Sequence, residues 1–403
     1  MLRITRGVVF IAASAIIASM STVASAGRSR DEVIRIGFVT DFSGPFEPVD
    51  GHAGAQAMRM AIEEVSGRAA GRRIELILGD HRNDVSVATA LAQEWTAKQR
   101  VDVIIGGVNS DTSLAIATVV HAAKNLMLVV GAGTTEHTRE QCSAFVVQYA
   151  YDTYSHGRAL ASVLARNGNK RWHLVTAEYP FGVQLEQATA LTVSELGGSI
   201  VGTVRHPHGA TEFAPIFDAA LRSGADVVSL SNTHSEVVAA VKAARALHIQ
   251  SRLQLAATFV SIDDIHEIGL EQAQGMYVTD SWYWSRDDET RRWSRAFFER
   301  TGRMPSSLQA ADYSAVKQYL LAVDQSRSTE PARVLAQMKS HALSDVYTHS
   351  AQLRGDGRLI HDMYVLQIKR PDQSTEAWDY YQPVATVSGS YASLPETPCG
   401  VRM

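Results

Sequence analysis

The stretch "VDVIIGGVNSDTSLAIATVVHAAKN" (101–125) decides the fold class of this chain. It opens with an apolar run typical of a buried strand and ends with apolar residues at helical spacing. Between them lies "GGVNSDTS" (106–113), a loop rich in Asn, Ser, Asp and Thr. These residue types cap helix N-termini, and the same loop can also hold a ligand in a cleft. The pattern predicts a strand, a polar loop and a helix.

This strand–loop–helix pattern recurs along the chain from residue 33, in two series of similar size. The apolar runs of the first series are "VIRIGFVTDF" (33–42), "RIELILGD" (73–80), "VDVIIGGV" (101–108) and "LMLVVGAG" (126–133). Those of the second are "RWHLVTAEY" (171–179), "SIVGTVRHP" (199–207), "ADVVSLSN" (225–232), "LQLAAT" (253–258) and "QGMYVTDSW" (274–282). Near-continuous apolar strands that alternate with helices indicate parallel sheets covered on both faces. We therefore predict an α/β fold with two doubly wound, Rossmann-like lobes.

Polar clusters follow six of these strands, three in each series. They are "TDFSGP" (40–45), "NSDTS" (109–113), "GAGTTEHT" (131–138), "AEYPFG" (177–182), "SNTHSE" (231–236) and "ATFVS" (257–261). Doubly wound sheets bind ligands beyond the carboxyl ends of their strands, near helix N-termini. We therefore expect a ligand cleft between two facing lobes. In "NSDTS", one side chain suffices to cap the helix, which leaves its neighbours free for the ligand.

The C-terminal third of the chain departs from this alternation. Two or three helices over about 287–340 precede "SAQLRGDGRLIHDMYVLQIKRP" (350–371), in which Gly355-Asp356-Gly357 indicates a hairpin. The tail after residue 372 is polar and contains three prolines, so we expect it to run over the surface.

The first 26 residues have the features of a secretory signal peptide. Arg3 and Arg6 precede a short apolar stretch, and Ala24-Ser25-Ala26 fits a cleavage site. The mature chain, from about Gly27, then has 36 basic and 42 acidic residues once Arg3 and Arg6 are removed. This mildly acidic balance gives no electrostatic reason to bind nucleic acid or an anionic membrane. No second apolar stretch approaches the roughly 18 residues of a membrane span, which predicts a soluble, extracytoplasmic protein.

The two cysteines, Cys142 and Cys399, are expected to form a disulfide in an oxidising compartment; two separate buried thiols are the alternative. The "HPH" at 206–208 lacks further ligands at a useful spacing for a metal. The chain contains no G-x-S-x-G elbow, no P-loop and no complete G-x-G-x-x-G fingerprint. We therefore predict no metal, no cofactor and no enzymatic activity.

Taken in order, "IRIGFVTDFSGPF", "DVIIGGVNS", "LVVGAGTTEHT", "AEYPFG" and "LEQAQGMYVT" resemble the periplasmic solute-binding proteins of the branched-chain amino acid type. These proteins are the extracytoplasmic receptors of bacterial ABC importers. The resemblance covers about 33–370 and implies a monomer with two lobes, joined by three crossovers, that close on a small solute. It also implies a periplasmic location and a permease partner in the inner membrane. The lobes would comprise 33–152 plus 281–345 (N-lobe) and 153–280 plus 346–403 (C-lobe).

The resemblance carries a set of ligand contacts onto this sequence. The carboxylate-binding serine falls on Ser110 or Asp111, next to Asn109, and the following loop contributes Ala132 and Thr134. On the C-lobe the aromatic contact becomes Phe181, and the next contact becomes Thr233 or His234. Aromatic residues at the predicted crossovers give further candidates, each with packing across the hinge as the alternative: Tyr151, Tyr154 and Trp282.

One departure from the family pattern bears on the ligand. Amino-acid binders pair the ligand ammonium with a carboxylate in the last C-lobe loop, where this chain has Thr258. An unpaired ammonium in a closed cleft would cost several kcal/mol. The sequence therefore favours a small organic acid or amide with an apolar or aromatic body. Asp111 could supply the missing charge from the other lobe, so an amino acid stays an alternative, as do a ligand-sensing subunit and a secreted enzyme.

Overall fold

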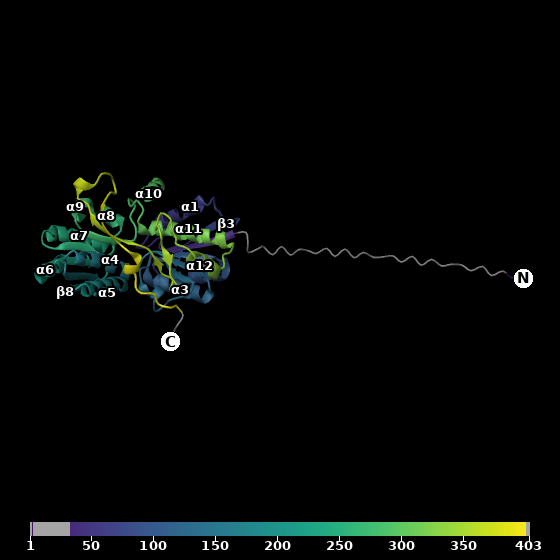
Figure 1. The fold of residues 1–403 in the computed structure, drawn as a ribbon, viewed down its shortest axis with the longest axis horizontal. Coiled ribbons are helices and arrows are strands. Elements are labelled where there is room, and N and C mark those ends of the chain that lie inside the picture. The colour runs from purple at the N-terminus through teal and green to yellow at the C-terminus, as the bar shows by residue number, and fades with distance from the viewer. Residues whose placement is uncertain (1, 3–32, 400–403) are drawn as a thin grey trace.

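The computed structural model describes Leu2 and residues 33–399, so the predicted signal peptide lies almost wholly outside the described residues. Two sheets lie side by side (Figure 1), one in each lobe. The N-lobe sheet has the strand order β2-β3-β1-β4-β5-β6. Its strands are β1 (Val33–Thr40), β2 (Arg68–Ala69), β3 (Arg72–Asp80), β4 (Val103–Gly106), β5 (Leu126–Val129) and β6 (Val146–Gln148). All pairs are parallel except β2–β3, which confirms the predicted doubly wound pattern.

Helices cover both faces of the N-lobe sheet. They are α1 (Gly51–Glu64), α2 (Val85–Glu94), α3 (Ser110–Ala123), α10 (Asp288–Thr301), α11 (Ser307–Ser326) and α12 (Pro331–Lys339). Alternation along β4 shows why two layers form: Val103 and Ile105 join the core beneath α1 and α11, whereas Ile104 joins the core beneath α2 and α3. A strand buried on both faces reads as a continuous apolar run, and "VDVII" is such a run.

The C-lobe sheet has the strand order β15-β14-β11-β10-β9-β7-β8. Its strands are β7 (Arg171–Ala177), β8 (Ser199–His206), β9 (Val227–Ser231), β10 (Gln254–Ala257), β11 (Tyr277–Asp280), β14 (Met363–Ile368) and β15 (Tyr381–Val387). The first five are parallel, and β14 and β15 add an antiparallel edge. The tail therefore does more than run over the surface, because it contributes an edge strand.

The C-lobe helices pack on both faces of this second sheet. They are α4 (Thr153–Arg166), α5 (Pro180–Glu195), α6 (Ala214–Ser223), α7 (Ser235–Ala246), α8 (Ile262–Ile268), α9 (Leu270–Ala273) and α13 (Gly389–Ala392). The described residues of the two lobes also form short segments of π or 3₁₀ helix, namely η1 (Trp95–Gln99), η2 (Thr135–Thr138), η3 (Ile249–Ser251) and η4 (Pro371–Gln373). Because α3, α5 and α7 each follow a parallel strand, their N-termini lie at the strand ends that face the other lobe.

The predicted hairpin forms at the junction of the lobes. β12 (Gln352–Leu353) pairs with β13 (Leu359–Ile360), and the turn holds Gly357 at a φ of 81°. Its Arg358 bridges to Gln148 at the end of β6, so the hairpin lies against the N-lobe sheet. The exact lobe boundaries stay a prediction.

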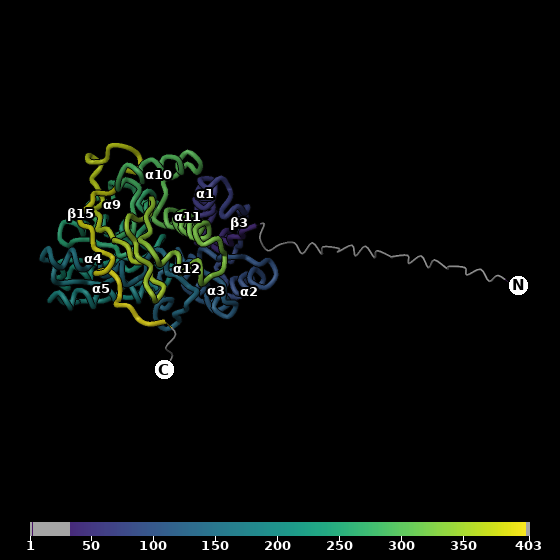
Figure 2. Tube along the Cα trace, turned by 45° about the vertical axis from the view of Figure 1, so that its right-hand side comes forward, coloured from purple at the N-terminus to yellow at the C-terminus, as the bar shows by residue number. Residues whose placement is uncertain are grey.

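The C-terminal segment leaves β15 and ends against the N-lobe, as the yellow tube in Figure 2 shows. Arg139 donates to the Pro395 carbonyl at 2.7 Å and also bonds Thr397. Cys142 and Cys399 form a disulfide with their Cα atoms 5.4 Å apart, which confirms the predicted pairing. The tail is thereby fastened to the N-lobe both covalently and by hydrogen bonds.

Candidate ligand-binding site

A cavity of about 570 Å³, part of it open to solvent, lies between the lobes. Its walls come from the ends of β4, β5, β7, β9 and β10 and from the segment after β1. The first crossover, which is the segment between β6 and α4, and the helix α11 complete them. The lining residues are Phe46, Val49, Val108, Asn109, Ser110, Asp111, Gly131, Gly133, Tyr151, Tyr179, Pro180, Phe181, Thr233, His234, Phe259 and Leu308. Five of the six predicted polar loops contribute directly, and the sixth, "TDFSGP", is followed at once by Phe46. The volume suits a small molecule.

The N-terminus of α3 forms part of the N-lobe wall, and its cap is Asn109. The Asn109 side chain accepts hydrogen bonds from the backbone N–H groups of Asp111, at 2.8 Å, and Thr112, at 3.2 Å. Within "GGVNSDTS", Asn109 is therefore the residue that caps the helix. The same bonds occupy two of the donors that a ligand carboxylate would need at this helix end.

Ser110 and Asp111 lie beside this cap and line the cavity. Neither side chain has a hydrogen-bond or ion-pair partner among the described residues. Asp111 is exposed, and its carboxylate at the first turn of α3 is favourable to the helix dipole. This end of the cavity therefore offers a hydroxyl and a negative charge to a ligand.

The loop after β5 brings Gly131 and Gly133 to the cavity but turns Ala132 and Thr134 elsewhere. The Ala132 carbonyl accepts a hydrogen bond from the Gln148 side chain at 2.7 Å. The Thr134 hydroxyl receives a 3.3 Å hydrogen bond from Gln184 of α5 and thus contacts the other lobe. Ligand contact by these two predicted residues stays untested, and both lie outside the cavity lining.

Glycine at position 133 permits the approach of the two lobes. A Cβ atom there would lie 2.5 Å from a ring carbon of Phe181 and 3.2 Å from one of Tyr151. Both distances are shorter than ordinary van der Waals contact, so a larger residue would push the aromatic wall away. Close packing of Phe181 on this loop therefore depends on Gly133.

Aromatic rings form most of the remaining wall. Tyr179 and Phe181 are nearly parallel with centroids 6.4 Å apart, and Phe259 meets Phe181 edge-on at 5.3 Å. Tyr151 lies 5.3 Å from Phe259, and its hydroxyl donates to the Gly131 carbonyl at 2.8 Å. The predicted contacts Tyr151 and Phe181 thus meet in one wall, with Phe46 opposite on the N-lobe. Such a wall suits a planar or apolar ligand body.

Thr233 and His234 complete the C-lobe side. The Thr233 hydroxyl is bonded to the Tyr179 hydroxyl at 2.8 Å, which fixes that ring. His234 Nδ1 lies 3.3 Å from a carboxylate oxygen of Asp264, and the His234 ring meets Phe46 edge-on with centroids 5.9 Å apart. Both residues line the cavity, as expected, and His234 is the only basic side chain in its lining.

Three other predicted residues lie outside the lining. Thr258 is fully buried, and its hydroxyl donates to the Leu230 carbonyl; the next residue, Phe259, reaches the cavity instead. Trp282 is buried, and its indole N–H donates to the Val346 carbonyl at 2.8 Å. Tyr154 lies in the first turn of α4, below the guanidinium of Arg158. Trp282 thus packs at the hinge, the alternative considered for it, whereas Tyr154 contacts a residue of its own helix.

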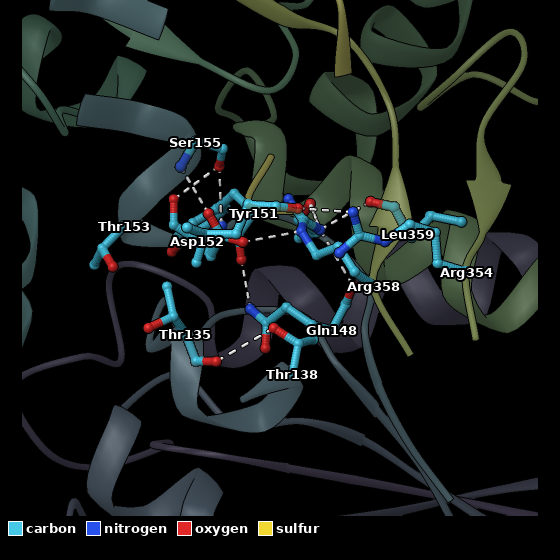
Figure 3. A network of polar contacts seen from close by, with 12 residues as sticks. Thr135, Thr138, Gln148, Tyr151, Asp152, Thr153, Ser155, Arg354, Arg358 and Leu359 are labelled. Carbon is cyan, nitrogen blue, oxygen red and sulfur yellow. Dashed lines mark hydrogen bonds and ion pairs between the residues drawn. The ribbon is translucent and has the colours of Figure 1, made fainter. Parts of the chain in front are cut away.

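A buried polar network holds the first crossover (Figure 3). Arg358 of the hairpin lies 3.0 Å from the Asp152 carboxylate and donates to the carbonyls of Gln148 and Ala150. Asp152 also caps α4 by accepting from the Ser155 N–H at 2.7 Å. Both charged side chains are almost completely buried, with exposed fractions of 2% and 3%. Their pairing satisfies charges that would otherwise be costly in the interior.

An ion pair also crosses the mouth of the cavity. Arg303, between α10 and α11, lies 3.3 Å from the Asp263 carboxylate of α8 and donates to the Pro48 carbonyl at 2.7 Å. Burial raises the pKa of Asp263 to about 6, although Arg303 opposes the shift. About a quarter of each charged side chain is exposed, so solvent screens this pair.

Sequence reasoning missed several residues of the site, namely Phe46, Tyr179, Phe259, Arg303 and the Asp263-Asp264 pair. Tyr179 and Phe259 each lie one or two positions from a predicted contact within a predicted loop. Phe46 and Arg303 carried no such signal, because their roles depend on the approach of the opposite lobe.

Among the described residues, no group of three or more His, Cys, Asp or Glu side chains is arranged to hold a metal ion. The cavity lining also contains no hydrogen-bonded serine–histidine pair. Ser113 and His137 are bonded at 2.8 Å, but both are fully buried elsewhere in the N-lobe. The site thus offers aromatic surface, hydroxyls, the Asp111 carboxylate and the His234 imidazole.

Known proteins resemble this chain in both sequence and structure. The curated relative "Leu/Ile/Val-binding protein homolog 6" of Brucella abortus is 26% identical over 213 residues, which is 53% of this chain and about half the length of that relative. A periplasmic binding protein from Burkholderia mallei is 40% identical, with a TM-score of 0.86 over 93% of this chain and 100% of its own. A branched chain amino acid ABC transporter periplasmic ligand-binding protein from Burkholderia xenovorans is 31% identical, with a TM-score of 0.84 over 89% and 96% of the two chains.

A more distant structure shares the fold alone. It is a solute binding protein of an ABC transporter from Rhodopseudomonas palustris in complex with p-hydroxybenzoic acid, with 21% identity and a TM-score of 0.80 over 89% of this chain and 98% of its own. The family model described as periplasmic binding protein matches residues 33–375 of this chain. The cleft between two doubly wound lobes, the relatives and this match together establish that the chain belongs to the periplasmic binding protein family.

Proposed function

We propose that this protein is the extracytoplasmic receptor of an ABC importer and that it closes its lobes on a small organic acid with an aromatic or apolar body. The observation that carries the proposal is the shared cavity, whose walls come from loops of both lobes. A ligand seated there contacts both lobes only in the closed state. Its differential affinity for that state would drive closure.

The chemistry of the walls supports this ligand class. Tyr179, Phe181 and Phe259 present ring faces and edges, while few polar groups reach the cavity. The last C-lobe loop presents Phe259 and not a carboxylate, so it has no partner for an ammonium group. The hydroxybenzoate bound by the Rhodopseudomonas palustris protein shows that this fold can hold an aromatic acid.

An amino acid is the second candidate, and one observation favours it. The Asp111 carboxylate lines the cavity and has no partner among the described residues. It could pair with a ligand ammonium from the N-lobe side. An amino acid would then bind across the cavity, with its carboxylate toward the C-lobe.

A binding role is more consistent with the lining than a catalytic one. Ser110 is the only serine in it and has no histidine or lysine within hydrogen-bond distance, so the lining lacks an activated nucleophile. Nowhere in the described part of the chain is a helix both long and apolar enough to cross a membrane. A secreted receptor in the periplasm, which hands its solute to a permease, fits these features together with the predicted signal peptide.

Thermal unfolding of the purified protein against a ligand panel tests the proposal. The panel should pair each acid with its neutral amide, as in 4-hydroxybenzoate and 4-hydroxybenzamide, and should include leucine and phenylalanine. A ligand at 100 times its Kd adds about 2.7 kcal/mol, a rise of a few degrees in Tm. Small-angle scattering should then show a more compact protein in the presence of that ligand.

The outcomes separate the candidates. A shift with aromatic carboxylates supports the proposal, whereas a shift with leucine or phenylalanine alone favours the amino-acid alternative. Chemical turnover of any bound compound would contradict the binding role. The absence of any shift over a broad panel of acids, amides and amino acids would contradict the ligand class.

A further inference from the structure

His234 occupies a position that helix capping does not explain. It is the N-cap residue of α7, yet its side chain makes no capping hydrogen bond. Its backbone has a φ of 48° and a ψ of −124°, a region that residues with a Cβ rarely adopt. Such strain destabilises the fold and is concentrated at functional sites. A glycine or asparagine would meet the backbone requirement better.

The strained backbone holds the imidazole between a carboxylate and the cavity. Nδ1 lies 3.3 Å from Asp264, whereas Nε2 has no hydrogen-bond partner among the described residues. Asp264 is itself fixed, because it accepts a hydrogen bond from the Ser261 N–H at 2.8 Å at the start of α8. The ring of Phe46, from the other lobe, covers part of the imidazole. A ligand group in the cavity therefore finds one free imidazole nitrogen with a fixed orientation.

Acidic groups around this imidazole favour its charged form. Burial alone would lower the pKa of His234, but the hydrogen bond and charge of Asp264 outweigh it, and Glu236 and Asp263 act in the same direction. The net result is a pKa above the ordinary value. Glu236 is itself bonded to His208, and Asp263 to Arg303. Asp264 is left as the acid that faces the ring directly.

The opposite wall has the opposite charge. Asp111 is the acidic group of the cavity lining, and the N–H groups of α3 nearest to it are occupied by Asn109. An anionic ligand group at that wall would meet the Asp111 carboxylate. At the C-lobe wall it would meet the His234 imidazole, whose Nε2 has no hydrogen-bond partner among the described residues. The cavity is therefore polarised from lobe to lobe.

We propose that His234 selects an anionic group on the solute, so that the acid end of the ligand binds the C-lobe and its hydroxyl or ammonium end faces Ser110 and Asp111. The inference rests on the proposed function and specifies the charge and orientation of its ligand. Asp264 acts as a positioning residue, since it orients the imidazole and stabilises its charge. Its neighbour Asp263 bonds Arg303 across the cleft, so ligand binding at His234 occurs next to a contact between the lobes.

The first test compares two probes of nearly the same shape, 4-hydroxybenzoate and its neutral amide 4-hydroxybenzamide, by calorimetry on the full-length mature protein. The variants are His234→Gln, which keeps hydrogen bonding but removes the charge, and Asp264→Asn. The matched control is His349→Gln, because His349 is also bonded to an aspartate, Asp287 at 3.0 Å, but lies outside the cavity lining. Thermal unfolding of each free variant checks that it is folded.

We expect His234→Gln to weaken carboxylate binding by at least about tenfold, as for loss of a charged hydrogen bond, and to change amide binding much less. Asp264→Asn should weaken the carboxylate in the same direction, and His349→Gln should have no effect. In the wild type, carboxylate affinity should fall as the pH rises through the raised pKa of His234, since the proton is then lost. That slope should disappear in His234→Gln.

Equal weakening of acid and amide would overturn the inference, because it would show a structural role for His234. So would wild-type affinity for the amide equal to that for the acid; in both cases the proposed function stands. If the panel identifies an amino acid instead, leucine and leucinamide replace the two probes with the same expected outcomes. If no compound of the panel binds, the proposed function fails and the inference fails with it.

Discussion

Two arginine–aspartate pairs join distant segments of this protein, one at the hinge and one at the mouth of the cleft. At the hinge, Arg358 and Asp152 lie 3.0 Å apart and are almost completely buried. At the mouth, Arg303 and Asp263 lie 3.3 Å apart, and about a quarter of each is exposed. Both pairs join an arginine to an aspartate, but they differ in their exposure to solvent. Opening a buried pair leaves an unpaired charge in the interior, whereas the charges of a partly exposed pair can be hydrated at little cost.

The comparison fits the motion expected of a two-lobe receptor. The crossovers must keep their geometry while the lobes move, so a pair that is costly to break suits the hinge. Contacts across the mouth must form and break with each ligand, so a weak pair suits them. Four changes test this division, beginning with the one of largest expected effect.

Arg358→Gln should destabilise the protein by about 3–5 kcal/mol, because it leaves the Asp152 carboxylate buried without its partner. The measurement is denaturant unfolding, with Arg303→Gln as the matched variant at the other pair. If Arg358→Gln lowered the free energy of unfolding by less than about 1 kcal/mol, burial would not distinguish the two pairs.

Loss of the Cys142–Cys399 bridge should cost about 2–4 kcal/mol, since the cross-link restricts a very long loop of the unfolded chain. The double variant Cys142→Ser/Cys399→Ser gives the effect without free thiols. Urea unfolding under oxidising conditions measures it, and the wild type in reductant is the control. An unchanged midpoint would show that the tail needs no covalent fastening.

His234→Gly should change the stability of the ligand-free protein by less than about 1 kcal/mol, because relief of the backbone strain is offset by the entropy of glycine and by loss of the hydrogen bond to the buried Asp264. The same variant should bind the acid probe at least about tenfold more weakly. Nearly unchanged stability together with weaker binding would show that His234 serves ligand binding and not folding. Loss of both stability and affinity would assign it a structural role.

Arg303→Gln should change the stability of the ligand-free protein by less than about 1 kcal/mol, because the pair is partly exposed to solvent. Its effect should appear in the bound state, as a faster dissociation of the ligand in stopped-flow measurements. Asp263→Asn should behave in the same way, since it removes the other partner. An unchanged dissociation rate in both variants would show that this pair does not help to hold the closed lobes together.

Much of the fold was predictable from the sequence, because buried parallel strands read as continuous apolar runs and the loops after them as polar clusters. β4 followed by α3 is the clearest case. β15 was missed because its sequence contains Pro383, which is acceptable only in an edge strand such as this one.

The site was less predictable. The capping of α3 by Asn109 and the placement of Phe181 and His234 follow from local sequence patterns. The contacts between lobes do not, because Arg303 and Asp263 lie 40 residues apart and meet only when two separate sheets face each other. Likewise, the burial that raises the pKa of Asp263 is a property of the assembled cleft. Nothing in the sequence around these residues distinguishes them from ordinary surface charges.

The disulfide closes a covalent ring, because Cys142 and Cys399 are 257 residues apart and the whole seven-stranded sheet lies between them. During synthesis, nearly two thirds of the chain is made between Cys142 and its partner, so the bridge can form only when the chain is almost complete. Once the ring is closed, a protease that cuts any surface loop within it opens a ring and releases no fragment. Such a nicked molecule keeps both pieces joined, so its two lobes can stay on either side of a bound solute after the main chain has been cut.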